Sequence, residues 1–171
     1  MTRVSKIALS LKLLGAALLV SASAGSFAAD DAKAQTAAAD PAAAKQAIAV
    51  RKAAFVLIAN NFKPIGEVLQ GKAAYNQADI AKRAERVAFL SLLLDGTFPE
   101  GSNLGAPHTK SKPEVWTKKA DFDKQIKDFQ ANAAALAQIA AKESTASDAF
   151  KKAAKAVAEG CKGCHDGYKE K

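Results

Sequence analysis

The chain has 171 residues and a formal net charge of +8; 49% of its residues are hydrophobic, but only 6% are aromatic. This length suits one domain of ordinary size. Much of the apolar content is alanine, which favours helices because it loses no side-chain entropy there. The positive charge is spread along the chain without an arginine- and aromatic-rich patch, which excludes a typical nucleic-acid-binding protein.

The first 28 residues have the pattern of a secretory signal peptide. Arg3, Lys6 and Lys12 precede the apolar run "LLGAALLV", and small residues, Ser26 and Ala28, stand before the predicted cleavage point. A retained amphipathic anchor is the alternative. Cleavage removes three basic residues and no acidic one, so the formal charge falls from +8 to +5. We expect a periplasmic mature protein without a membrane span, because no later stretch is apolar enough.

Residues 29–40 contain charges and alanines but no large apolar side chain, which predicts a flexible lead-in to one domain over residues 41–171. The first helix of that domain should begin at Pro41 with Asp40 as its N-cap. Apolar residues then recur at helical spacing. Pro64 should end or kink the helix, which can continue to a stop at Gly71.

Three further amphipathic helices follow, over residues 77–94, over residues 119–141, and from an N-cap at Thr145 almost to the last residue. A long loop rich in glycine, proline and small polar residues separates the first two of these. No segment alternates polar and apolar residues as a strand does. We therefore expect an all-α protein, an antiparallel four-helix bundle.

The motif "CKGCH" near the end of the last helix carries the chemistry. Cys161 and Cys164 lie one helical turn apart, and His165 leans toward the same face. That face continues the apolar stripe of the helix, so all three side chains should point inward.

Four functions compete for this motif. A redox dithiol needs a helix N-terminus, whereas this pair lies at the C-terminal end. A disulfide would close a two-residue loop and stabilise little. Zinc needs four ligands, and the only other histidine, His108, lies in the long loop. The fourth function is covalent haem attachment at the C-terminal end of the bundle, for which C-x-x-C-H is the signature. Cys161 and Cys164 would form the thioethers of haem c, and His165 would be the axial iron ligand.

The residue types of the mature chain limit which side chain could be the sixth ligand of the iron. Its only methionine is Met1, which leaves with the signal peptide, so histidine–methionine ligation is excluded. His108 is a possible second ligand, but its polar loop favours a solvated imidazole. Protonated lysines are poor ligands. We therefore expect a five-coordinate iron with one open face.

Four segments, "RKAAFVLIANNFKPI", "FPEGS", "KPEVW" and "CKGCHDGYK", resemble the cytochrome c′ family, the class II c-type cytochromes. The resemblance covers residues 50–169. It implies a homodimer with one covalent, high-spin haem c per subunit, which binds nitric oxide and carbon monoxide and discriminates against dioxygen. It also implies that the protein is not an enzyme, although slow nitric oxide reduction stays open.

The resemblance also assigns residues to the haem pocket. Phe55 matches the distal residue, where relatives with methionine are low-spin electron carriers. Arg51 matches an arginine near the haem propionates, and Lys52 replaces the usual glutamine beside it. The alternatives are a core aromatic for Phe55 and solvated cations for the other two. Trp116 should pack at the haem edge or cap the loop, and Lys169 stands where the family usually has arginine.

These observations predict a periplasmic haem protein that binds gases or scavenges nitric oxide and can exchange electrons with periplasmic redox partners. The alternative is a low-spin, six-coordinate electron-transfer cytochrome. A haem-free helical binding module is the third hypothesis.

Overall fold

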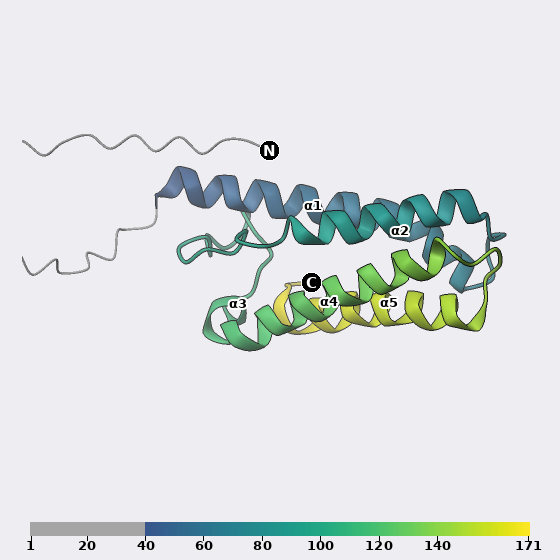
Figure 1. Cartoon of the computed structure of the whole chain (residues 1–171). Helices are drawn as coiled ribbons and strands as arrows, with labels where there is room; N and C mark the ends of the chain where they lie inside the picture. Colours follow the sequence, from purple (N-terminus) through teal and green to yellow (C-terminus); the bar gives the residue numbers. More distant parts are fainter. Residues whose placement is uncertain (1–39) are drawn as a thin grey trace, which may run out of the picture. The chain divides into compact units, whose positions relative to one another are not determined.

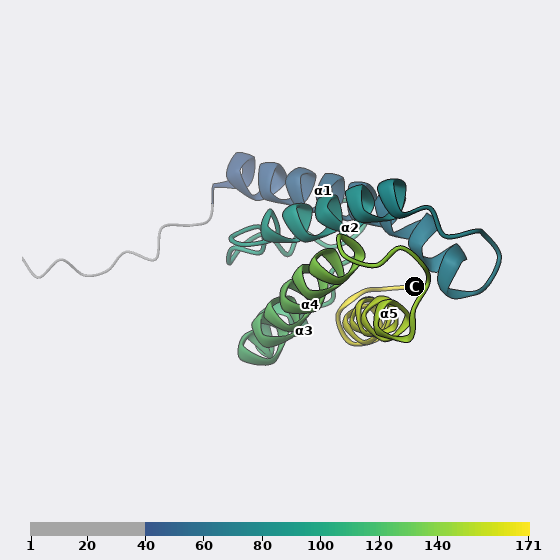
Figure 2. The same ribbon diagram turned by 45° about the vertical axis from the view of Figure 1, so that its right-hand side comes forward.

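The computed structural model describes residues 40–171, so the predicted signal peptide and most of the predicted lead-in lie outside the described residues. Within this range there are five helices: α1 Pro41–Leu69, α2 Gln77–Leu92, α3 Glu114–Thr117, α4 Lys119–Ala140 and α5 Asp148–Tyr168. The four long helices form two layers, α1 with α2 and α4 with α5 (Figures 1 and 2). The predicted all-α four-helix bundle is confirmed. None of the helices in residues 40–171 is both long and apolar enough to cross a bilayer.

Helix α1 begins as its sequence predicts. The Asp40 carboxylate accepts a hydrogen bond from the Ala42 amide at 2.9 Å, and Pro41 occupies the first turn. Pro64 lies inside the helix, which continues to Leu69. The last turns of α1 bend away from the line of the first turns (Figures 1 and 2), as expected where a proline removes one backbone hydrogen bond.

The connection between α2 and α4 differs from its prediction in three ways. Helix α2 ends at Leu92, two residues before the predicted end, and Leu93 is 43% exposed. The short helix α3 interrupts the predicted loop. Ser111 also forms an isolated antiparallel bridge with Lys169, just after α5. A single bridge has no sequence period, so no pattern could have indicated it.

Helix α5 begins later than predicted. Ser147, not Thr145, is the N-cap: its hydroxyl accepts a hydrogen bond from the Phe150 amide at 3.2 Å, whereas Thr145 is exposed. This start places Asp148 in the first turn, where a negative charge is favourable. It also directs Phe150 into the core, where its side chain is fully buried and its ring meets the ring of Tyr75 at 4.9 Å.

The corrected cap makes a direct prediction. Ser147→Ala should lower the free energy of unfolding by ~1 kcal/mol, because the Phe150 amide loses its acceptor. Thr145→Ala is the matched control and should leave the stability unchanged. Denaturant unfolding of both variants checks this, and a larger loss in Thr145→Ala than in Ser147→Ala would contradict the assignment.

Candidate functional site

A cavity of about 440 Å³ lies between α1 and α5 and is closed by the connection that precedes α4. Helix α1 contributes Arg51, Lys52, Phe55, Val56 and Ala59, one face of consecutive turns. The rest of the lining comes from α5 and its end, from the connection, and from α3 and α4: Cys164, His165, Tyr168, Lys169, Phe98, Pro107, His108, Thr109, Lys110, Ser111, Val115 and Phe122. Helix α1, the connection before α4 and the C-terminal motif of α5 therefore meet at this cavity.

The α5 wall carries the predicted attachment motif. Cys161 and Cys164 are half-buried and pack against the core, as their stripe predicts. His165, which we expected to point into the interior, is exposed and lines the cavity. The buried side of the last turn of α5 is occupied by Tyr168, three residues later. The imidazole therefore lies on a neighbouring side of the helix, which is exposed.

The environment of the two thiols bears on the competing functions. Burial raises the pKa of Cys161, and burial together with the nearby Cys161 raises the pKa of Cys164 to about 11. A redox dithiol needs a lowered pKa, so this environment opposes that function. The two cysteines form no disulfide. No group of three histidine, cysteine, aspartate or glutamate side chains in the described part of the chain is arranged to hold a metal ion.

The α1 residue next to the imidazole is apolar. The rings of Phe55 and His165 lie 6.3 Å apart, centroid to centroid, at an angle of 68°. The two rings therefore border the same cavity from two different helices, Phe55 from α1 and His165 from α5. Phe55 is half-buried in the cavity wall, which makes it more than a core aromatic.

Arg51 is buried in the structure, with 2% of its surface exposed. Its two terminal nitrogens donate hydrogen bonds of 3.0 Å to the carbonyl of Thr97, to the hydroxyl and carbonyl of Ser102, and to the hydroxyl of Thr109. Burial lowers the pKa of Arg51 to about 10, so the side chain stays charged at neutral pH. A solvated cation is thus the wrong description of Arg51, whereas Lys52 is exposed at the cavity.

Three other residues take definite places. The indole N–H of Trp116 donates to the Pro99 carbonyl at 3.0 Å, so this side chain caps the loop. His108 and Lys169 both line the cavity and are both exposed. The loop acceptors of Arg51 were missed by the sequence reasoning, because single hydroxyl residues in a glycine-rich connection form no periodic pattern.

Comparison with known proteins identifies the family. A family model described as Cytochrome C' matches residues 46–169. The chain belongs to the cytochrome c′ family. It is 39% identical to a cytochrome c′ of Rubrivivax gelatinosus over 73% of this chain and 95% of that protein.

Solved cytochromes c′ share its fold. A cytochrome c prime from Shewanella frigidimarina aligns with a TM-score of 0.69 and 43% identity, covering 75% of this chain and 97% of the other. A nitric oxide complex of a mutant of cytochrome c prime from Alcaligenes xylosoxidans aligns with a TM-score of 0.66 and 31% identity, over 75% and 97% of the two chains. The cofactor is covalent haem c, as in the family, and the haem-free hypothesis is wrong.

The haem fits the residues present. Cys161 and Cys164 would hold it through thioethers, and His165 would ligate the iron, which supplies the gas-binding and redox chemistry. Arg51 lines the cavity without a carboxylate partner in residues 40–171, and a haem propionate would supply the missing negative charge. These assignments remain predictions about individual residues.

Removal of the thiols tests the attachment. The double variant Cys161→Ala/Cys164→Ala should release its haem when the protein is denatured, whereas Cys164→Ala should retain haem through the remaining thioether. Mass spectrometry of the denatured chains measures this. Haem that stays attached to the double variant would contradict the assignment.

Proposed function

We propose that this protein is a periplasmic haem protein whose five-coordinate, high-spin iron binds nitric oxide and carbon monoxide. The observation that carries the proposal is the distal wall: the group facing His165 across 6.3 Å is the ring of Phe55, which cannot ligate iron. The next α1 residues in the cavity lining are Val56 and Ala59, which cannot ligate iron either. The predicted signal peptide supports the periplasmic location.

The same wall accounts for the choice among gases. Bound dioxygen is polar at iron and gains from a hydrogen-bond donor, whereas nitric oxide and carbon monoxide depend less on one. Phe55, Val56 and Ala59 offer no side-chain donor. The Phe55 ring must also move aside to admit a ligand, so its rotation can gate the rate of binding. The iron can in addition exchange electrons with periplasmic redox partners; the protein is proposed as a binder rather than an enzyme.

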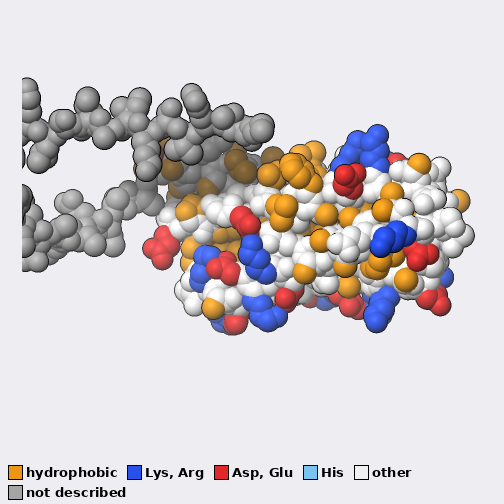
Figure 3. All heavy atoms as spheres, viewed as in Figure 1, with side chains coloured by type: hydrophobic (Ala, Val, Ile, Leu, Met, Phe, Trp, Pro, Cys, Tyr) orange, Lys and Arg blue, Asp and Glu red, His pale blue; other side chains and the backbone are white. Residues whose placement is uncertain are grey.

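The homodimer is also a proposal, supported by an apolar surface on the α1–α2 layer. The exposed large apolar residues of this surface are Val56 and Leu57 on α1, Phe89 and Leu92 on α2, and Leu93 just after α2. Phe89 is 64% exposed and Val56 67%. Figure 3 shows apolar side chains gathered over this layer. An apolar surface of this kind is typical of an interaction site.

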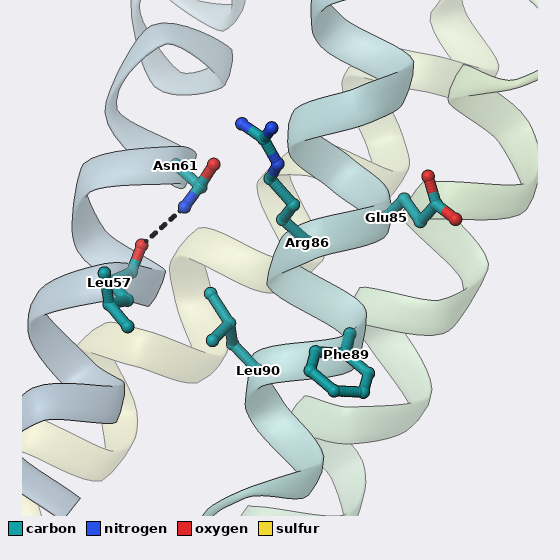
Figure 4. A pocket seen from close by; sticks show the side chains of 6 residues that line it. All are labelled: Leu57, Asn61, Glu85, Arg86, Phe89 and Leu90. Carbon is teal, nitrogen blue, oxygen red and sulfur yellow. Dashed lines mark hydrogen bonds between the residues drawn. The ribbon is translucent and has the colours of Figure 1, made fainter.

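A groove of about 500 Å³ in this layer gives the surface its shape. Leu57 and Asn61 come from α1, and Arg86, Phe89 and Leu90 come from α2 (Figure 4). Glu85 lies beside Arg86 in the lining. In a two-fold symmetric pair each patch meets its own copy, so the acidic and the basic side chain can pair across the interface while the apolar residues are covered.

Spectroscopy of the mature holoprotein tests the iron site. The ferric protein should give a high-spin electron-spin-resonance spectrum, and the ferrous protein should bind carbon monoxide and nitric oxide. Phe55→Met should convert the iron to a low-spin form, because it places a thioether opposite His165, and Phe55→Leu is the apolar control that should stay high-spin. A low-spin wild type that does not react with carbon monoxide would instead favour the electron-transfer alternative.

A charge introduced into the patch tests the dimer. Phe89→Glu should yield a monomer, since it buries an unpaired carboxylate in the interface. Ala134→Glu, at an exposed position on α4, is the control and should keep the wild-type mass. Sedimentation of the holoproteins over a range of concentrations measures both. A dimer of undiminished affinity in Phe89→Glu would rule this surface out.

A further inference from the structure

The buried guanidinium of Arg51 binds a single segment of the chain. All four of its hydrogen bonds go to residues of the 97–109 connection, 46 to 58 positions further along the sequence. The guanidinium carbon also lies 4.8 Å from the Phe98 ring centroid and 5.9 Å from that of Trp116. A charged group taken out of water needs such partners, so the segment and the arginine hold each other in place.

The hydrogen bonds continue from Arg51 toward the α5 wall. The Thr109 hydroxyl, which accepts from Arg51, donates to the Ser111 hydroxyl at 3.0 Å and accepts from the Ser111 amide at 3.1 Å. Ser111 in turn bridges Lys169, four residues after His165. The segment is therefore fixed at both walls of the cavity.

His108 lies between these anchored points. It precedes Thr109, its amide donates to the Gly105 carbonyl at 2.9 Å, and its exposed imidazole lines the same cavity as His165 and Phe55. The chain has only two histidines, so His108 is the one other imidazole that can reach an iron held by His165. A tethered ligand next to a metal acts at a high effective concentration.

We propose that Arg51 is a positioning residue: it clamps the 97–111 segment and so keeps His108 at the edge of the cavity, away from the sixth position of the iron. This inference rests on the proposed five-coordinate site. The open iron face then depends on two features, a wall residue that cannot ligate and a loop whose imidazole is restrained.

Variants of the clamp test the proposal in the holoprotein. Arg51→Gln and Thr109→Val should each convert part of the ferric iron to a low-spin form, because the loosened segment lets His108 ligate. The double variants Arg51→Gln/His108→Ala and Thr109→Val/His108→Ala should return to the high-spin spectrum. Thr145→Val, which removes an exposed hydroxyl outside the clamp, is the control and should match the wild type.

Amide hydrogen exchange gives an independent measurement. Exchange within residues 97–111 should be faster in Arg51→Gln by about tenfold, roughly the contribution of one lost hydrogen bond. If Arg51→Gln does not mature with haem, Thr109→Val retains most of the clamp and carries both measurements.

The outcomes separate this inference from the function on which it rests. A high-spin spectrum in both clamp variants would overturn it, and so would a low-spin spectrum that survives His108→Ala. A low-spin wild type would contradict the five-coordinate function instead, and the clamp would then be judged on hydrogen exchange, where unchanged rates in Arg51→Gln overturn it.

Discussion

A buried cation that pairs with no carboxylate in residues 40–171, Arg51, links helix α1 to the connection before α4. Arg51 is removed from water at a considerable cost, which four loop acceptors and two aromatic rings offset. These partners are neutral, and together they hold the guanidinium in one orientation. This single group joins a regular helix to the least regular part of the bundle. Lysine could not replace it, because a point charge lacks the planar set of donors.

The bundle brings the two ends of the domain together around the cavity. Helix α1 lies beside α2, α2 packs on α4, and α4 packs on α5, so the first and last long helices close the ring. The cofactor motif on α5 thus faces the apolar residues of α1. Neither helix could form the cavity alone, since α5 carries the predicted ligand and thiols and α1 carries the Phe55 wall.

The sequence predicted the regular parts of this arrangement well. Apolar spacing placed the long helices, and Asp40 with Pro41 located the first start correctly. The cap of α5 was wrong because Thr145 and Ser147 are both good capping residues, and only the burial of Phe150 decides between them. Leu93 lies after the end of α2, so its exposure could not be predicted from the helical spacing of the apolar residues.

The attachment motif of the site could be predicted from the sequence, but the contacts made by the loop could not. The C-x-x-C-H motif is contiguous, so Cys161, Cys164 and His165 could be recognised together. The acceptors of Arg51 lie 46 to 58 residues away on a chain segment without periodicity, and a contact of that kind depends on the path of the backbone. His108 is exposed in the loop, as expected of a solvated residue, but its place in the cavity lining could not be predicted for the same reason.

The proposed thioethers and axial ligand all lie within two turns of α5, while the distal wall lies more than 100 residues earlier. Contacts so distant in sequence slow folding, because a long stretch of chain must be closed into a loop before they form. A haem bonded to α5 stays with the chain through every opening of the bundle. Loss of structure and loss of cofactor are thereby separate events, and a chain that unfolds can refold around the haem it already carries.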